Sequence, residues 1–432
     1  MFFSISLILF LLLIFRIKGN SSIDPISKRI LLIYVVVWGL TICCSSLDVS
    51  DLHTPSLKLR CFLVGHVIAF LLGYKLVKIN KQTINKFSFE TLHRKLDRLT
   101  DSLLFRVISI ILTAYILSLV AVFFRTLAVL SLSEMRNDFY DQELYGSLFS
   151  MINGPILSVF NSIALPIFAW MLLYKRNIYT IVLGAYLVGY ASLGGGRFGY
   201  LIIIIEAIFV ALCVFLTNKN RAQRLKQVAI ISGIMLVLIT SVTALRYGLS
   251  TNGKDASHDA IEETAKSLYY YSVGPLSALD YAIENHYENR INGYQYGGLT
   301  LCSIQAFLYT FLNTFGIVYD KSDLDKMVSI KQDEYIPIGT ETYWNALYST
   351  NLYYYLDFGY LGIIIIPFFL GMLVRYTIKL MYRYNNIPFF ILAAYVFNIM
   401  VLSFVNFRFT GLFELLFVVG LYICGKHRIS LG

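Results

Sequence analysis

The sequence predicts an all-α polytopic membrane protein with about eleven (eleven or twelve) transmembrane helices. Of its 432 residues, 57% are hydrophobic and only 14% are charged, whereas average soluble domains are about 45–50% apolar and 25% charged. The mean hydropathy is +0.66, and apolar runs of spanning or near-spanning length recur along the chain. This composition excludes a soluble enzyme, a disordered chain and a small disulfide scaffold.

Twelve apolar runs are candidate spans. They cover residues 2–15, 30–47, 61–77, 107–124, 153–173, 177–193, 198–217, 227–245, 298–318, 358–376, 387–405 and 409–425. The first run has no basic residue before it and is followed directly by Arg16 and Lys18. This polarity is the opposite of a cleaved signal peptide, so we expect an uncleaved span with its N-terminus outside.

Basic residues test this count, because lysine and arginine favour cytoplasmic loops. They follow every second span until the run 298–318. If that run crossed the membrane, the acidic segment 319–357 would be cytoplasmic and the basic loop after residue 376 would face outward. Polar interruptions such as Gln305 and Asn313 suit a re-entrant or interfacial helix instead. We therefore prefer eleven spans, with the C-terminus inside.

The eleven-span topology divides the chain into three parts. Residues 1–245 form an N-terminal bundle of eight spans, residues 246–357 form a large outer loop region, and residues 358–432 form a C-terminal bundle of three spans. The net charge of +10 then separates into +19 inside, from 23 basic and 4 acidic residues, and −7 outside, from 13 basic and 20 acidic residues. Glu206 and Glu414 lie within spans.

Cysteine and histidine usage predicts no metal site. The six cysteines are scattered, mostly in or beside apolar runs, where they are expected to be small buried hydrophobic residues. The six histidines form no pair at helical spacing. We expect no metal and no cofactor, and we interpret the basic charge as a topology signal rather than as a sign of nucleic-acid binding.

Four arginines depart from the charge rule because they lie on the predicted outer side. They are Arg125, Arg197, Arg246 and Arg408. The fork of donors in a guanidinium matches the oxygens of phosphate or carboxylate, so four arginines from different helices can converge on one anionic headgroup. The alternative is that each one snorkels to the interface or pairs with an acid such as Glu414.

The turn before Arg197 strengthens the anion hypothesis. Gly195 and Gly196 belong to a run of three glycines that allows a sharp turn and a close approach of the backbone to a ligand. A helix is expected to start near Phe198, and its free N–H groups attract an anion. The alternative is a tight hairpin with an incidental arginine.

Aromatic residues cluster in the outer region. They include Tyr269–Tyr271, Tyr294, Tyr296, Tyr343, Trp344, Tyr348 and Tyr353–Tyr355. Rings with a polar edge suit stacking on sugars and also suit membrane-interface belts. Candidate general bases in the same region are Asp280, Glu341, Asp357, His258 and His286, and the sequence does not choose among them.

An ordered set of motifs adds a family resemblance. It comprises Ser192–Arg197 (SLGGGR), Tyr271–Asp280 (YSVGPLSALD), Tyr296–Thr300 (YGGLT) and Asn351–Gly362 (NLYYYLDFGYLG). In their order and spacing, over roughly residues 180–375, the chain resembles the Wzy-type O-antigen or oligosaccharide repeat-unit polymerases of bacterial envelopes. The first half resembles that family only in its many spans and terminal arginines, and the family's arginine-containing loop repeats have no match here.

The resemblance implies a fold similar to the multispan class C glycosyltransferases, with a large periplasmic loop over the site. It implies a glycosyltransferase of the bacterial inner membrane that polymerises undecaprenyl-pyrophosphate-linked repeat units at the periplasmic face. A hydroxyl of the acceptor unit attacks the anomeric carbon of the donor glycan, and undecaprenyl pyrophosphate leaves. The implied partners are these lipid-linked glycans, membrane lipids, a chain-length regulator and a flippase of the same pathway.

Residue roles follow from that chemistry. Arginines held in place stabilise the charge that develops on the leaving pyrophosphate, and a carboxylate or imidazole removes the acceptor proton. We expect the catalytic residues to be Arg197, Arg246, Asp357, Glu341 and Asp280. We expect substrate contacts from Arg125, Arg408, Gly195, Gly196, Tyr353, Tyr354, Tyr270 and Trp344.

Two alternatives remain open from the sequence. An O-antigen ligase, which moves the finished glycan onto the lipid A core, would share the arginines and the outer loop. Such ligases commonly rely on a histidine in that loop, and His258 or His286 would fill this part. A lipid-linked oligosaccharide flippase or other transporter usually shows paired halves and charged residues inside the bundle. This chain shows no internal repeat and concentrates its polar residues in one outer region.

Overall fold

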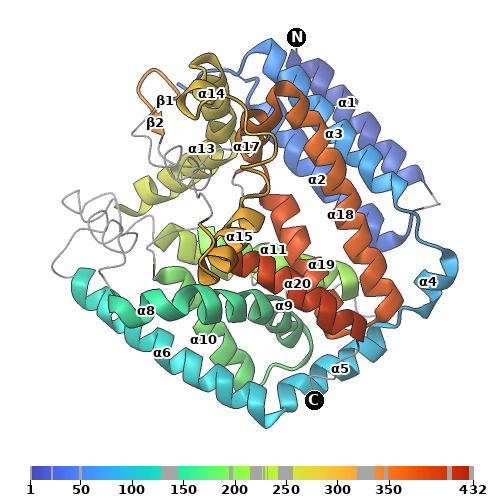
Figure 1. The fold of residues 1–432 in the computed structure, drawn as a ribbon, viewed down its shortest axis with the longest axis vertical. Helices are drawn as coiled ribbons and strands as arrows, with labels where there is room; N and C mark the ends of the chain where they lie inside the picture. Colours follow the sequence, from blue (N-terminus) through green and yellow to red (C-terminus); the bar gives the residue numbers. More distant parts are fainter. Residues whose placement is uncertain are drawn as a thin grey trace. The chain divides into compact units, whose positions relative to one another are not determined.

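The computed structural model describes residues 2–20, 23–47, 51–127, 145–193, 198–214, 226, 229–230, 232–241, 256–318, 336–344, 349–405 and 411–427. The chain divides into two compact units (Figure 1). Unit 1 comprises Met1–Lys86, Ser267–Arg383 and Ile399–Gly420, and unit 2 comprises Phe87–Lys266, Tyr384–Asn398 and Leu421–Gly432. Both units draw on distant parts of the sequence, so the division at residues 245 and 357 remains a prediction about topology rather than packing.

Unit 1 combines long apolar helices with a polar cap. Its helices are α1 (Phe2–Gly19), α2 (Pro25–Cys44), α3 (Leu57–Leu76), α4 (Lys81–Lys86), the end of α13 (Ala256–Glu284), α14 (Tyr287–Arg290), α15 (Cys302–Thr314), α17 (Thr350–Phe358) and α18 (Gly362–Tyr384). A short 3₁₀ turn, Gly359–Leu361, joins the last two. Strands β1 (Ile336–Pro337) and β2 (Tyr343–Trp344) pair antiparallel, with Ile336 opposite Trp344.

Unit 2 is built from helices of the central part of the chain. They are α5 (Phe89–Asp101), α6 (Leu103–Leu127), α8 (Gly146–Ile152), a π-helical turn (Asn153–Ser158), α9 (Val159–Tyr174), α10 (Ile178–Ser192) and α11 (Phe198–Val214). Helices α19 (Ile387–Leu402) and α20 (Leu412–His427) are divided between the units. Helix α5 is amphipathic, and its buried face meets α9 through the ring of His93, which lies 5.3 Å from Trp170 and 4.6 Å from Tyr174.

The structure agrees with the prediction of an all-α membrane protein. Within the described residues, six helical segments are long and apolar enough to cross a membrane. They are Phe2–Gly19, Pro25–Cys44, Leu57–Leu76, Leu103–Leu127, Gly146–Tyr174 and Thr350–Tyr384. Shorter apolar helices occupy Ile178–Ser192, Phe198–Cys213, Ser232–Ser241 and Ile387–Leu402. All of these helices coincide with predicted spans.

Polar residues beside the apolar runs fix where the helices begin. The side chain of Asp24 accepts a hydrogen bond from the backbone N–H of Ser27 (3.0 Å), and Pro25 follows it at the first position of α2. Ser56 caps α3, and Asn177 forms a reciprocal capping box with Thr180 in α10. Each cap satisfies donors that the first helical turn leaves free.

Two glycines allow α3 and α18 to pack backbone against backbone within unit 1. A Cβ atom on Gly73 would overlap the carbonyl oxygen of Phe368, and one on Gly371 would overlap the carbonyl oxygen of Phe70. Small residues at such crossings are typical of membrane helix pairs, where close packing replaces the hydrophobic effect. Figure 1 shows α18 running alongside α3, and these two glycines mark the place of closest approach.

A buried ion pair joins α2, α3 and α18 at one end of unit 1. Arg375 donates to the Asp24 carboxylate and to the Ser27 hydroxyl, and its Nε donates to the Val77 carbonyl (3.3 Å). The Tyr382 hydroxyl donates to the second oxygen of Asp24 (2.6 Å). We name this end, with the lysines around it, the basic end.

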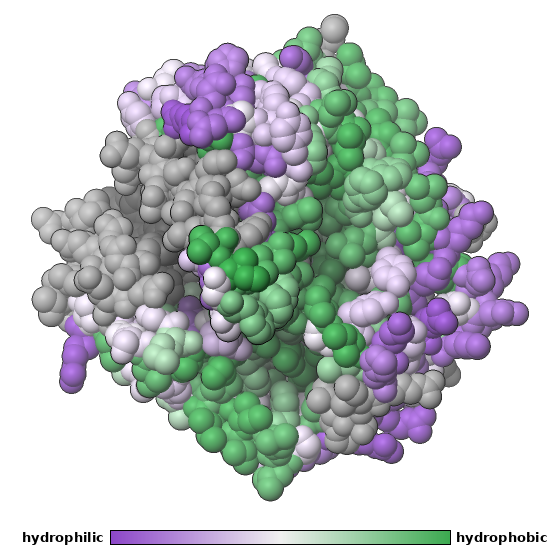
Figure 2. Space-filling model, in the orientation of Figure 1, coloured by the Kyte–Doolittle hydropathy of each residue, from purple (hydrophilic) through white to green (hydrophobic). Residues whose placement is uncertain are grey.

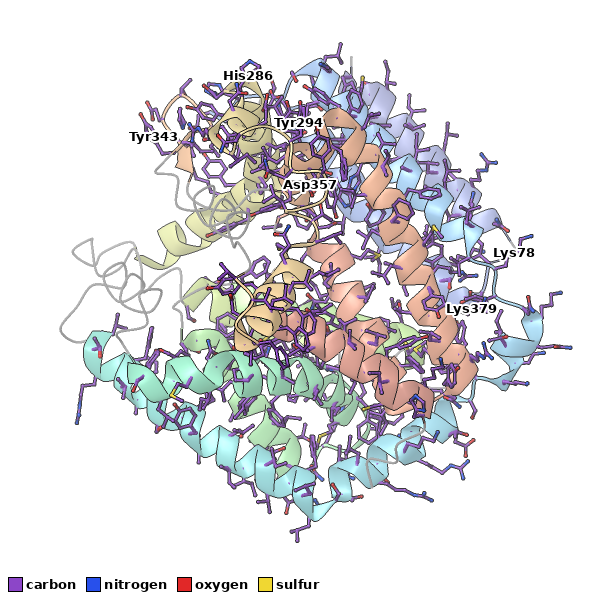
Figure 3. The ribbon with its side chains drawn as sticks, viewed as in Figure 1. Lys78, His286, Tyr294, Tyr343, Asp357 and Lys379 are labelled. Carbon is purple, nitrogen blue, oxygen red and sulfur yellow. The ribbon has the colours of Figure 1, made fainter. Side chains whose placement is uncertain are left out.

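Unit 1 is polar at both ends and apolar between them. Figure 3 shows Lys78 and Lys379 at the basic end, whereas His286, Tyr294 and Tyr343 lie at the opposite end of the same unit. Between the ends, the surface over α1 and α18 is hydrophobic (Figure 2), with exposed side chains on both helices. We name the end that contains α14, β1 and β2 the polar end.

Candidate functional site

Three segments that are distant in sequence meet at the polar end of unit 1. The loop before α3 pairs with the β1–β2 hairpin, because Leu52 forms a β-bridge with Gly339 and the N–H of His53 donates to the Ile338 carbonyl (2.7 Å). The same loop contacts α13, since Ser277 donates to the His53 carbonyl (2.8 Å). The polar end is therefore a folded cap built on the helices and not a free loop.

Asp51 joins these segments through its side chain. One carboxylate oxygen accepts from the Tyr270 hydroxyl (2.6 Å), and the other accepts from the hydroxyl of Thr342. Burial raises the pKa of Asp51, but the hydrogen bonds from Thr342 and Tyr270 outweigh burial, so the pKa lies below its ordinary value. Tyr270, a predicted sugar contact, is thus placed at this junction.

Asp280 is an anchor for α3. Its two oxygens accept from the Ser56 hydroxyl and the Ser56 N–H, both at 2.7 Å. Ser56 is the residue that caps α3, and a negative charge is favourable at a helix N-terminus. Both oxygens of this predicted catalytic carboxylate are therefore already engaged.

Asp357 plays the same part for the turn before α15 (Figure 3). It is completely buried, and its two oxygens accept from the backbone N–H groups of Leu299 (3.0 Å) and Thr300 (2.7 Å). The backbone around it continues the connection, since Tyr296 donates its N–H to the Asp357 carbonyl (3.0 Å). The YGGLT and LDFG motifs are thereby brought together, although 57 residues separate Thr300 from Asp357.

The segment that runs from His286 through α14 to the turn before α15 has an unusual backbone. His286, Asn292 and Tyr296 adopt positive φ angles of 53°, 62° and 50°, as do Gly293 (94°) and Gly297 (99°). Residues other than glycine rarely adopt this left-handed backbone conformation, and those that do cluster at functional sites. The hydrogen bonds of Asp357 and of the neighbouring backbone hold this segment in place, so we define residues 286–300 as the site loop.

Aromatic rings line the site loop. Tyr294 is partly exposed and lies edge-on to Tyr355, with 6.0 Å between ring centroids. Tyr355 contacts Tyr360 (5.4 Å), and the ammonium of Lys58 lies 4.1 Å above the Tyr360 ring. Tyr355 itself is 4% exposed, so the accessible part of this cluster consists of Tyr294, Tyr360 and Lys58. Their rings, hydroxyl groups and one cation suit a polar, ring-shaped ligand such as a sugar.

One pair within the site loop has the geometry of a proton acceptor. The Nδ1 of His286 lies 3.0 Å from Oε1 of Glu288. The His286 side chain is 69% exposed, whereas that of Glu288 is 12% exposed. A carboxylate only accepts hydrogen bonds, so Nδ1 carries the hydrogen and Nε2 is left as an acceptor on the exposed ring edge.

The other predicted site residues occupy different environments. Tyr353 and Tyr354 are 1% and 3% exposed and lie inside unit 1. Glu341 is exposed in the β1–β2 hairpin, and Trp344 lies in β2. Arg125 is exposed in the last turn of α6 in unit 2. Five residues lie outside the part of the chain that the structure describes: Arg197, Arg246, Arg408, Gly195 and Gly196.

Sequence reasoning missed the roles of Asp51 and Glu288. Asp51 lies in a short connection between two predicted spans, and nothing in its neighbourhood identifies its partners more than 200 residues away. Glu288 was detectable, because a histidine and a glutamate two residues apart in a loop are able to interact locally. The burial of the Glu288 side chain, which sets this pair apart from one on the surface, was not detectable from the sequence.

The described residues contain no group of three or more His, Cys, Asp or Glu side chains placed to hold a metal ion. What the site loop and its neighbours offer instead is the imidazole of His286, the carboxylate of Glu288, tyrosine hydroxyls and the ammonium of Lys58. These groups suit proton transfer and hydrogen bonding to hydroxyl-rich ligands. No family model, no curated protein and no solved structure matches this chain.

Proposed function

We propose that the chain polymerises undecaprenyl-pyrophosphate-linked oligosaccharide repeat units at the periplasmic face of the bacterial inner membrane. A hydroxyl on the acceptor unit attacks the anomeric carbon of the donor glycan. The bond from that carbon to the pyrophosphate breaks, and undecaprenyl pyrophosphate leaves. The resemblance in residues 180–375 suggests this reaction, and the following features support it.

The observation that carries the proposal is the opposition of the two ends of unit 1. Lys78 and Lys379 lie at one end, and His286 and Tyr294 of the site loop lie at the other (Figure 3). Because basic residues favour the cytoplasmic side, the polar end faces the periplasm. That is the side on which lipid-linked repeat units are joined in the polymerases that this chain resembles.

The length of α15 suits a re-entrant or interfacial helix, as the eleven-span topology requires. It contains 13 residues, which rise about 20 Å at 1.5 Å per residue. A helix perpendicular to the bilayer needs about 30 Å to cross the hydrocarbon core. A re-entrant or interfacial α15 leaves residues 246–357 as one periplasmic region.

The chemistry of the transfer fits the residue types present. The leaving pyrophosphate gains negative charge as the glycosidic bond breaks, and arginines stabilise that charge without a metal. Arg197 and Arg246 are assigned this role from their sequence positions, with Arg125 and Arg408 as further contacts to the headgroup. The apolar flanks of the helices accommodate the polyprenyl tails, and a flippase and a chain-length regulator are the expected partners.

Deletion of the gene followed by electrophoresis of lipopolysaccharide tests the proposal. A polymerase deletion collapses the ladder to the lipid A core plus one repeat unit, and the wild-type gene restores long chains. The variants Arg197→Ala and Arg246→Ala should give the same collapse, because one lost electrostatic donor typically costs about 10²–10³ in rate. Arg98→Ala, which removes an exposed arginine of α5, is the matched control and should keep the ladder.

Two outcomes contradict the proposal. Complete loss of O-antigen on deletion would indicate a ligase or a flippase, because neither single nor repeated units would then reach the core. An unchanged ladder on deletion would exclude all three activities.

A further inference from the structure

The His286–Glu288 pair combines an exposed imidazole with a buried carboxylate. Nδ1 of His286 lies 3.0 Å from Oε1 of Glu288, and the two side chains are 69% and 12% exposed. The carboxylate thus fixes the orientation and tautomer of the ring, and it leaves Nε2 on the solvent side. An oriented imidazole with one free nitrogen is the arrangement that general-base catalysis requires.

Stability does not explain why Glu288 is buried. Its second oxygen, Oε2, is buried and has no hydrogen-bond partner among the described residues. A buried carboxylate oxygen without a donor destabilises the folded state, and an ion pair with an exposed histidine stabilises it only weakly. A residue that is costly to the fold and is nevertheless buried beside a histidine points to a function for the pair.

The backbone at His286 carries a second cost. Its φ angle is 53°, and left-handed backbone at a residue with a side chain is unfavourable. Two backbone hydrogen bonds hold it there. The N–H of Asn289 donates to the His286 carbonyl (2.9 Å), and the N–H of Gly293 donates to the Glu288 carbonyl (2.7 Å). The loop therefore fixes the position from which the imidazole projects.

The neighbours of the pair suit a carbohydrate. Tyr294, an exposed tyrosine of the same loop, lies edge-on to the buried Tyr355, and the ammonium of Lys58 lies 4.1 Å above the ring of Tyr360. Tyrosine rings and hydroxyl groups beside a base provide stacking and hydrogen bonds for a sugar whose hydroxyl is to be activated. Asp280 and Asp357, by contrast, have both oxygens engaged with donors of the protein.

We propose that His286 is the general base of this site and that Glu288 is its positioning residue. The assignment rests on the proposed polymerase function. Nε2 of His286 takes the proton from the acceptor hydroxyl while that oxygen forms its bond to the anomeric carbon of the donor. The bond from this carbon to the pyrophosphate breaks, and its electron pair leaves on the phosphate oxygen. Glu288 stabilises the imidazolium, which then returns its proton to water.

The test measures joining of repeat units in membranes that contain the full-length chain. Lipid-linked repeat units extracted from the deletion strain serve as both donor and acceptor, and the product is the lipid-linked dimer. His286→Ala should lower kcat by about 10²–10⁴, with a small change in KM. Added imidazole should restore part of the rate in this variant and should not accelerate the wild type. Glu288→Gln should lower kcat, and Glu288→Asp should recover part of the loss.

His53→Ala is the matched control, because His53 is another exposed histidine at the polar end whose recorded contacts are made by its backbone. This variant should keep the wild-type rate. Thermal unfolding of Glu288→Gln should occur at or above the wild-type temperature, which separates a role in catalysis from a role in folding. Lower activity together with lower stability in every variant, without rescue by imidazole, would overturn the assignment.

The two proposals fail in different ways. A wild-type rate in His286→Ala would exclude His286 as the base and leave the polymerase intact. Absence of dimer with the wild-type chain, under conditions in which the extracted units are intact, would overturn both the polymerase and the base.

Discussion

The buried Asp24–Arg375 pair should dominate the stability of unit 1. The side chains of Asp24 and Arg375 are 0% and 8% exposed. Asp24→Ala would remove the charge, the cap of α2 and the acceptor of the Tyr382 hydroxyl. Arg375 would stay buried with neutral partners alone, namely the Ser27 hydroxyl, the Val77 carbonyl and the ring of Tyr74, whose centroid lies 5.2 Å from the guanidinium carbon.

The expected loss of stability in Asp24→Ala follows from these lost interactions. Removing one member of a buried ion pair costs about 3–5 kcal/mol, because the remaining charge is left uncompensated. A loss of about 1 kcal/mol shifts Tm by roughly 2–4 °C for a domain of 150–250 residues, so the expected fall is roughly 6–20 °C. Asp24→Asn should lose less, because its amide oxygen still caps α2. The double variant Asp24→Ala/Arg375→Met should be more stable than Asp24→Ala, since the unpaired charge is gone.

The assay follows thermal unfolding of the purified protein in detergent with a thiol-reactive dye. Cys43 and Cys302 are buried in unit 1, so they react when this unit opens. A fall in Tm of less than about 2 °C for Asp24→Ala would refute the reasoning, since it would correspond to only about 1 kcal/mol. Additive effects in the double variant would refute it equally, because they would show that the two side chains do not act on each other.

Unit 1 yields three further predictions. Gly73→Leu should destabilise the protein by more than about 1–3 kcal/mol, because the new side chain would overlap the backbone of Phe368, which cannot move aside as a side chain can. Gly420→Ala should leave the stability unchanged, because nothing lies within 4 Å of the added Cβ atom; thermal unfolding of the two variants tests this. In a background without native cysteines, Tyr343→Cys should react with a membrane-impermeant maleimide added to spheroplasts and Lys78→Cys should not, and the reverse result would invert the proposed orientation. Burial raises the pKa of Asp24, but the charge of Arg375 and its hydrogen bonds lower it below the ordinary value, so its contribution is complete above the unfolded pKa of about 3.9 and is lost as the pH falls through the folded pKa; the stability difference between wild type and Asp24→Asn, followed by tryptophan fluorescence, should shrink below about pH 4.

The helices were predictable because each spanning segment is recognisable from its own residues, without knowledge of its partners. A run such as 107–124 is apolar over the length that a bilayer requires, and the structure extends it to Leu103–Leu127. Helix α17 was not foreseen as a buried element, since its three consecutive tyrosines have polar edges and Gly359 interrupts the run that continues into α18. Its burial depends on α17 meeting other helices, as when the N–H of Thr350 donates to the Ser403 carbonyl (3.0 Å).

The site was predictable as a region but not as a set of roles. The sequence placed Asp280, Asp357 and the tyrosines in one outer region because that region follows from charge and hydropathy. It gave no means of seeing that Ser56 would engage both oxygens of Asp280, because the two residues are 224 positions apart. Long-range pairing of this kind depends on how the helices pack, and helix packing depends on details such as the contact of Gly73 with Phe368.

The carboxylates of the polar end differ in the number of hydrogen-bond donors that surround them. A motif identifies a carboxylate by its sequence neighbours, but its chemistry depends on how many donors the fold directs at it. Asp51, Asp280 and Asp357 each accept at least two hydrogen bonds from residues that are distant in the sequence, and each one thereby connects distant parts of the chain. Within the described residues, the Glu288 side chain has one hydrogen-bond donor, His286, which lies two positions away. A role in holding the fold together accounts for the first three residues, and the fourth is the one to which we assign a role beside the proposed base.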